Sequence, residues 1–308
     1  AHRARWWMIR SQALFADANA HDQLLQSLDN AVNLYAEVAP REWGYVQALM
    51  LRAYMLQNSN PVDSEREFER AATAAGQVHD RNRDDRNLYE IQQGLATART
   101  LQGKMAEAEA PFRKALELAE TTQDTKSGNY FLTLANYANA LHRQGKRVEA
   151  HAVFDRLFRQ IALASDEGKT GNDAYYGREI YGLSLSAEGR LGDAVAVLEE
   201  VEHAYTARPN WEGQLRRMRR YLGDAYALAG RPADARRILK SALDERVAKN
   251  APDYPPLLTL RERWGRFLLS QGESDAAKEQ FMEVLAQMHE RTFESAARAH
   301  AGLAKIAL

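Results

Sequence analysis

The stretch "LGDAYALAGRPADARRILKSAL", residues 222–243, has the pattern of two helices joined at a glycine. Leu222 and Tyr226 are four residues apart, so they share one face of a first helix. Gly230 ends this helix, because glycine adopts the left-handed conformation of a helix C-terminus without a steric penalty. A second helix then begins at Pro232, a residue suited to a first helical turn. The stretch therefore predicts a helical hairpin.

The second helix of this hairpin places Ala235, Leu239, Ala242 and Leu243 on one face. Gly223 on the first helix and Ala235 on the second are small, so the two helices can approach closely. Larger residues at these positions would push the helices apart. We call the first helix of such a hairpin helix A and the second helix B.

Similar hairpins recur along the chain. Glycines equivalent to Gly230 are separated by 42, 44, 41 and 42 residues, and two degenerate copies near the N-terminus carry Asn19 and Ser59 instead. One hairpin cannot bury its apolar face alone, so neighbouring hairpins must stack into a continuous core. The sequence therefore predicts an all-α fold of fifteen helices without a strand. The repeat glycines are Gly103, Gly145, Gly189, Gly230 and Gly272.

The predicted architecture is a single solenoid domain over residues 1–308, made of about seven antiparallel hairpins and a C-terminal capping helix. Polar or proline-bearing segments between the hairpins are expected to be loops rather than domain linkers. The predicted repeats span 1–38, 39–80, 81–122, 123–165, 166–208, 209–250 and 251–290, and the cap spans 291–308.

Composition narrows the function classes. The 308 residues contain 41 Lys and Arg against 42 Asp and Glu, so the chain as a whole has no basic excess that would attract nucleic acid or anionic lipid. Hydrophobic residues make up 45% of the chain, which is enough for a packed core. The chain has no cysteine, which excludes disulfides, thiol catalysis and cysteine-ligated metals.

The beginning of the chain bears on its origin. The sequence starts at Ala1 without a methionine, and we expect it to be a fragment of a longer polypeptide, with processing as the alternative. No apolar run approaches the length of a membrane span, which is roughly 18 residues. A cytoplasmic location is expected, with a periplasmic or exported one left open.

The repeat pattern resembles a known family. Leu222, Gly223, Tyr226, Gly230, Ala235, Ala242 and Leu243 fit the pattern L-G-x-x-Y-x-x-x-G-x-x-x-x-A-x-x-x-x-x-x-A-L of the tetratricopeptide repeat (TPR). The period of 41–44 residues is longer than the usual repeat of about 34. In this it resembles kinesin light chains and the C-terminal regions of bacterial Ser/Thr kinases and large ATP-dependent transcription activators. The segment "TLANYANALHRQGKRVEA" (133–150) is similar to the light-chain version.

The resemblance implies a right-handed superhelix whose concave wall, built from the A helices, holds a peptide or a partner protein. On that geometry we expect polar side chains of four consecutive A helices to face the groove. The candidate ligand-binding residues are Asn136, Asn139 and Arg143, then Tyr176 and Glu179, then Arg217, Arg220 and Asp224, and finally Glu262 and Arg266.

The arginines at 216–220 have alternative interpretations. Arg217 and Arg220 could recognise a carboxylate or phosphate, because a guanidinium binds these anions bidentately. All four arginines could instead form a solvated edge paired with nearby acidic residues. Arg216 and Arg219 are expected to lie towards a neighbouring helix or the rim. The chain has no helix-turn-helix or aromatic stacking surface that would favour nucleic acid.

Asn136 and Asn139 could hydrogen-bond the backbone of a bound peptide, since an amide donates and accepts, or they could simply face water. The TPR subtype that clamps chaperone tails needs further Lys and Asn residues. The neighbouring repeats carry Gln93 and Thr97 or Tyr176 and Ile180 instead, which disfavours that clamp.

The first two A helices present an apolar wall at the groove positions. This wall seals the end of the core or accepts a partner helix. Its residues are Trp6, Ile9, Ala13, Val46, Leu49 and Ala53, with Trp7 and Trp43 nearby.

No catalytic motif and no zinc-ligand spacing of histidines is present, so we expect no enzyme activity, no cofactor and no metal. The predicted function is a non-catalytic protein- or peptide-binding module whose ligand carries acidic groups, without nucleic acid or a membrane span. We expect it to be the sensory or docking arm of a larger bacterial signalling protein, of the Ser/Thr kinase or transcription activator type, which would supply an upstream domain. A stand-alone scaffold or chaperone-like adaptor is the alternative, and a small-molecule sensor is a third hypothesis.

Overall fold

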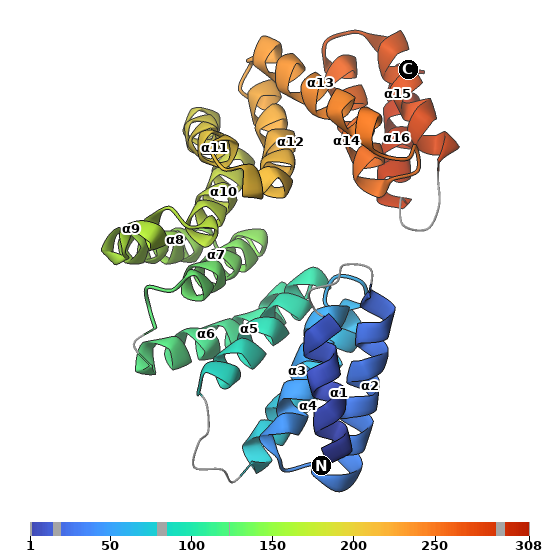
Figure 1. The fold of residues 1–308 in the computed structure, drawn as a ribbon. Coiled ribbons are helices and arrows are strands. Elements are labelled where there is room, and N and C mark those ends of the chain that lie inside the picture. The colour runs from blue at the N-terminus through green and yellow to red at the C-terminus, as the bar shows by residue number, and fades with distance from the viewer. Residues whose placement is uncertain (1, 15–19, 79–84, 123, 288–292, 308) are drawn as a thin grey trace. The chain divides into compact units, whose positions relative to one another are not determined.

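The structure, a computed structural model, describes residues 2–14, 20–78, 85–122, 124–287 and 293–307. Within these ranges the regular structure is helical and contains no strand, which confirms the predicted all-α fold (Figure 1). Fifteen α-helices of 13–18 residues account for it, together with a four-residue helix, α9 (Asp166–Lys169), and a 3-10 turn, η1 (Pro209–Trp211).

The chain divides into two compact units, Ala1–Gly177 and Arg178–Leu308. The prediction of one domain over the whole chain stays a prediction. Helix α10 (Asn172–Ala187) contributes to both units. The N-terminal unit contains α1 (His2–Leu14), α2 (His21–Val38), α3 (Trp43–Leu56), α4 (Pro61–Gln77), α5 (Asp85–Leu101), α6 (Met105–Thr121), α7 (Gly128–Arg143) and α8 (Arg147–Leu163).

The C-terminal unit has the same alternation of helices A and B. Its last helix, α16, packs on both α14 and α15, as expected for a cap. The A helices of the chain are α1, α3, α5, α7, α10, α12 and α14. The C-terminal unit contains α11 (Leu191–Thr206), α12 (Glu212–Leu228), α13 (Pro232–Lys249), α14 (Pro255–Ser270), α15 (Ser274–Ala286) and α16 (Phe293–Ile306).

The five repeat glycines end their helices in the predicted conformation. Their φ angles lie between 72° and 80°, in the left-handed region. At Gly103 the amide of Lys104 donates to the carbonyl of Arg99 (2.9 Å) and the glycine amide donates to Thr100 (3.1 Å). These two bonds form the Schellman motif, and the same pair recurs at the other four glycines. The glycine period is therefore a period of helix ends.

Replacing Gly145 with alanine tests this conformation. A Cβ there would meet no atom within 4 Å, so the cost comes from the backbone alone. We expect Gly145→Ala to lower the free energy of unfolding by about 1–2 kcal/mol in urea titration. Gly192 lies in α11 with equal room and φ outside the left-handed region, and Gly192→Ala should be neutral or stabilising. Equal effects of the two substitutions would contradict the assignment.

A second set of glycines receives large side chains from B helices. A Cβ on Gly94 would lie 2.2 Å from the Phe68 ring, and one on Gly223 would lie 2.5 Å from Leu239. The close approach predicted at Gly223 is confirmed, and its partner on helix B is Leu239. Ala235 is fully buried in the same helix. Each glycine is thus a socket for a bulky neighbour.

Ion pairs connect the B helices of successive repeats. The N-cap residue of one B helix pairs with the B helix of the preceding repeat, as in Lys104 with Glu65 (2.6 Å). Burial raises the pKa of Glu65, but hydrogen bonds from Lys104, Arg99 and Gln102 together lower it to about 2. The other pairs of this kind in the described ranges are Lys146 with Glu109, Arg231 with Glu199, and Glu273 with Arg236, where the charges are exchanged.

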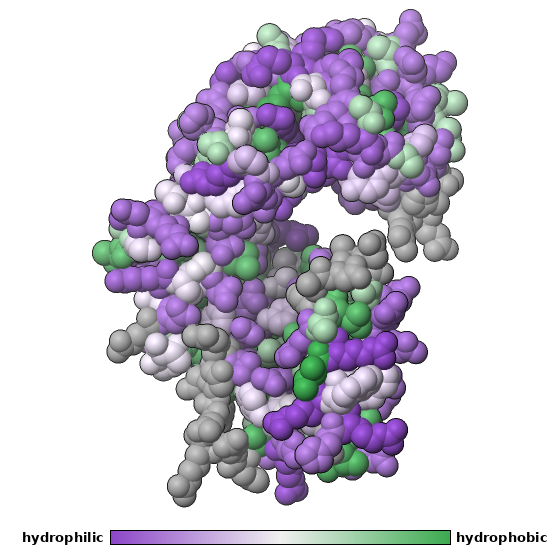
Figure 2. Space-filling view, viewed as in Figure 1, coloured by the Kyte–Doolittle hydropathy of each residue, from purple (hydrophilic) through white to green (hydrophobic). Residues whose placement is uncertain are grey.

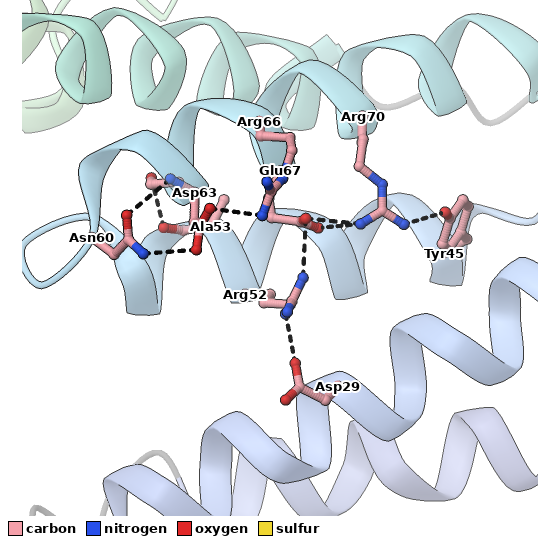
Figure 3. A network of polar contacts seen from close by, with 10 residues as sticks. Asp29, Tyr45, Arg52, Ala53, Asn60, Asp63, Arg66, Glu67 and Arg70 are labelled. Atoms are coloured by element: carbon pink, nitrogen blue, oxygen red, sulfur yellow. Dashed lines mark hydrogen bonds and ion pairs between the residues drawn. The ribbon is translucent and has the colours of Figure 1, made fainter. Parts of the chain in front are cut away.

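A buried carboxylate joins three helices of the N-terminal unit (Figure 3). Glu67 on α4 is 1% exposed, and its carboxylate lies 3.0 Å from Arg52 and 2.8 Å from Arg70. Arg52 also reaches Asp29 on α2 (2.6 Å), and Arg70 donates to the Tyr45 hydroxyl (3.0 Å). Because both arginines neutralise Glu67, we assign this network to the stability of the fold and not to ligand binding.

Candidate functional site

A polar groove of about 460 Å³ crosses three consecutive A helices of the N-terminal unit. We call it the α3–α5–α7 groove. Amide and hydroxyl side chains predominate in its lining, and Glu90 is the only carboxylate among the described residues that line it. The lining residues are Tyr54 and Gln57 from α3, Tyr89, Glu90, Gln93 and Thr97 from α5, and Asn129, Leu132 and Asn136 from α7.

Side chains of one A helix bind the backbone of the next and thereby set the width of the groove. The Tyr54 hydroxyl donates to the carbonyl of Glu90 (3.0 Å), and the Gln57 amide donates to that of Gly94 (3.2 Å). The Tyr89 hydroxyl donates to the carbonyl of Asn129 (2.6 Å). Burial raises the pKa of Tyr89 to about 12, so this hydroxyl keeps its proton at neutral pH. These hydrogen bonds therefore fix each A helix against the next.

Two of the predicted residues meet beside this groove. The Tyr176 hydroxyl donates to the side-chain oxygen of Asn136 (3.0 Å), which orients the amide and directs its donor group away from the tyrosine. Asn139 is half-buried and Arg143 is exposed, and neither lines the groove. Sequence reasoning named Gln93 and Thr97 only as departures from a clamp pattern. Their helical spacing on an A helix was the signal that they share the groove.

Glu179 and Arg217 neutralise each other in the C-terminal unit. Two guanidinium nitrogens of Arg217 lie 2.9 Å from the two carboxylate oxygens of Glu179, which is 1% exposed. The Tyr205 hydroxyl donates to the same carboxylate (3.4 Å). Arg217 is therefore committed to a buried carboxylate, and the predicted Arg217 and Arg220 pair is not available as two equivalent anion ligands.

Arg216 and Arg219 are half-buried, and each pairs with an acidic residue. Arg216 pairs with Glu212 one turn away (2.7 Å), and Arg219 reaches Glu202 on the neighbouring α11 (3.2 Å). Three of the four arginines at 216–220 are thus paired with acidic residues of the chain itself.

The remaining predicted residues lie on α12 and α14 around Arg263. The sequence analysis did not identify this cation. Asp224 forms an ion pair with Arg263, whose side chain is only 14% exposed. Burial, with the positive charges of Arg220 and Arg266, lowers the pKa of Arg263 to about 10. Arg263 lies within a helix rich in arginine, so its sequence context carried no signal of burial. The electrostatic environment here is an excess of positive charge.

Glu262 and Arg266 are one helical turn apart on α14, with 2.5 Å between the carboxylate and the guanidinium. Glu262 is fully buried, and burial raises its pKa despite the arginine. Arg220 lies over the Tyr221 ring, 5.0 Å from its centre, and the buried Arg220 Nε has no hydrogen-bond partner among the described residues. Arg220 also donates to the Tyr221 hydroxyl (3.3 Å) and has no ion-pair partner among the described residues.

The apolar wall predicted on the first two A helices divides into core and surface. Val46, Leu49 and Ala53 are fully buried, so they belong to the core and do not form a wall. Trp6 and Ile9 are 54% and 59% exposed. Ala13 is also exposed, whereas Trp7 and Trp43 pack against the core. On the face shown in Figure 2, hydrophobic side chains are scattered among hydrophilic ones.

The described part of the chain contains no group of three or more metal-ligating side chains. In the same part, no helix is long and apolar enough to cross a membrane.

Comparisons with known proteins identify the fold. No family model matches the chain, and no curated protein matches its sequence. Among solved structures, the apo form of RapI is similar with a TM-score of 0.67 and 10% identity, over 98% of this chain and 99% of that one. NprR in complex with its cognate peptide NprX is similar with a TM-score of 0.58 and 12% identity, over 99% of this chain and 81% of that one.

A third solved structure bears on the long repeat. A Podosopora anserina kinesin light chain candidate with nearly identical TPR-like repeats is similar with a TM-score of 0.54 and 17% identity, over 64% of this chain and 92% of that one. Stacked hairpins, left-handed glycines at the helix ends and these three likenesses agree with one another. The chain therefore has a TPR-like fold, as its repeat pattern predicted.

Proposed function

We propose that this chain is a non-catalytic protein- or peptide-binding module and that the α3–α5–α7 groove holds an extended segment of the ligand. The observation that carries this proposal is the row of amide and hydroxyl side chains across three consecutive A helices. The likeness to NprR, which was solved with a peptide, supports the same class of ligand.

The amides of Gln93, Asn129 and Asn136 each offer two donors and an acceptor, which is what the backbone of an extended peptide requires. Such contacts hold a backbone without demanding a particular sequence. The bond from Tyr176 orients the Asn136 amide before the ligand arrives, so less rotational freedom is lost on binding.

The excess of arginine on α12 and α14 supports a ligand with acidic groups. We further propose that the chain acts as the sensory or docking arm of a larger bacterial signalling protein of the Ser/Thr kinase or transcription activator type, in the cytoplasm. A stand-alone scaffold is the alternative. The parent gene distinguishes the two, since an adjoining kinase or DNA-binding domain favours the first.

The test is selection of peptides from a display library, followed by fluorescence anisotropy with a selected peptide. We expect Gln93→Ala combined with Asn136→Ala to weaken binding at least tenfold, because each lost hydrogen bond costs about 1 kcal/mol. Gln26→Ala removes an exposed amide from helix B α2 and serves as the matched control. Unchanged binding by the double variant would exclude this groove as the site. A library that yields no saturable binder would reject peptide binding itself.

A further inference from the structure

A second cavity, of about 610 Å³, lies between α14 and α16 in the C-terminal unit. We call it the α14–α16 cavity. Three cations line it, Arg266 from α14 and Arg298 and Lys305 from α16. Leu269 and Ala301 supply apolar lining, and no carboxylate is among its described lining residues. The cavity thus combines an apolar surface with positive charge.

The positive charge here exceeds what nearby carboxylates neutralise. Glu262 pairs with Arg266, and Glu294 pairs with Arg298 at a site where both side chains are well exposed. Lys305 is exposed and has no ion-pair partner among the described residues. An anion in this cavity would therefore gain attraction without displacing a buried ion pair.

The same excess continues along α14 and onto α12. The positive charges of Arg220, Arg266 and Arg298 each lower the pKa of the buried Arg263, so all three act on this one guanidinium group. From α12 to α16 the row has five cations, completed by Lys305, against the three carboxylates Asp224, Glu262 and Glu294. Such a row is electrostatically unfavourable until an anion binds.

We propose that the α14–α16 cavity binds an acidic segment of a polypeptide in which a carboxylate residue stands next to a large apolar one. This inference rests on the proposed peptide-binding function and assigns it a second, separate site. The carboxylates pair with Arg298 and Lys305, and the apolar side chain packs on Leu269 and Ala301. The volume of the α14–α16 cavity is within the range of ligand pockets, roughly 300–1,000 Å³, and leaves room for more than a lone oxyanion.

The probes are two fluorescently labelled peptides of equal length, one alternating Glu and Leu and one alternating Gln and Leu. We expect saturable binding of the Glu-Leu peptide and at least tenfold weaker binding of the Gln-Leu peptide, measured by anisotropy. Arg298→Gln combined with Lys305→Gln should weaken the Glu-Leu peptide about thirtyfold, because two charge-assisted contacts are lost. Both side chains are exposed enough that the melting temperature should hold.

The control for net charge is Arg237→Gln combined with Lys240→Gln on helix B α13. These side chains are 69% and 52% exposed, and their loss removes the same two charges elsewhere on the unit. The control should bind the Glu-Leu peptide within twofold of the wild type. Equal weakening by both double variants would show attraction to net charge alone and overturn the proposal. Equal binding of the two peptides would overturn it as well.

A competition with inorganic phosphate distinguishes a site for small oxyanions. Complete displacement of the Glu-Leu peptide by phosphate at equal concentration would show that the apolar lining contributes nothing, and the proposal would fail. The Gln93 and Asn136 double variant should bind the Glu-Leu peptide normally. If the groove assignment is wrong, the Gln93 and Asn136 double variant will bind the selected peptide as tightly as the wild type does. If the present inference is wrong, the Arg298 and Lys305 double variant will bind the Glu-Leu peptide as tightly as the wild type does.

Discussion

Replacing Ala235 with aspartate is expected to lower the free energy of unfolding by more than about 3 kcal/mol, because it buries a carboxylate without a partner. Ala235 is fully buried on helix B α13, the helix that packs against α12. The side chain would have to ionise in the core or bind a proton there, and both are costly. Urea unfolding followed by circular dichroism measures the change.

The control for this prediction is Ala233→Asp, two residues earlier. Ala233 is exposed in the first turn of α13, where a negative charge is favoured by the helix dipole. The control should leave stability unchanged or raise it slightly. If Ala235→Asp unfolded at the same urea concentration as the control, the packing of helix B against helix A would be wrong.

Removing the Phe281 ring is the second substitution with a large expected effect. Phe281 on α15 is fully buried, and glycines face its ring from two helices, Gly265 on α14 and Gly302 on α16. A Cβ at Gly302 would lie 2.4 Å from the ring, so the backbones of α14 and α16 pack closely against the ring. Phe281→Ala should cost about 3–5 kcal/mol, because helices set this closely cannot collapse fully into the space.

Two further variants test the contact between the Phe281 ring and Gly302. Met282 is the neighbour of Phe281 but is 52% exposed, and Met282→Ala should cost much less. Gly302→Ala should destabilise the native protein yet be tolerated together with Phe281→Ala, since the alanine methyl then occupies vacated space. Additive effects of Gly302→Ala and Phe281→Ala in a double-mutant cycle would show that the ring and the glycine do not touch.

The helix ends were accessible to sequence reasoning because their cause is local. A glycine at φ near +80° closes the Schellman motif with residues no more than five positions away, so Gly103 and Gly145 could be identified from spacing alone. The all-α fold followed from the same period. The contacts between glycines and bulky side chains could be predicted only in part. The pattern showed that Gly223 must be small but did not identify Leu239 as its partner.

The candidate site was predicted less well, because its residues are brought together from different repeats. Asn136 lines the α3–α5–α7 groove, and its hydrogen-bond partner Tyr176 comes from 40 residues further along the chain. Arg217 appeared to be half of an anion-binding pair until the fold placed Glu179, 38 residues away in sequence, against it. Arg263 was not singled out at all, since burial of a cation leaves no local mark.

The sequence by itself determined the period, the helix ends and the need for small residues between helices, because backbone sterics and apolar spacing act within a few residues. Only the tertiary structure decided which charges are neutralised by partners from other helices and which are not. Arg217 pairs with a buried glutamate, whereas Lys305 lines the α14–α16 cavity and has no ion-pair partner among the described residues. The reason is physical: an ion pair depends on distances between side chains of different helices, and stacking the repeats sets those distances.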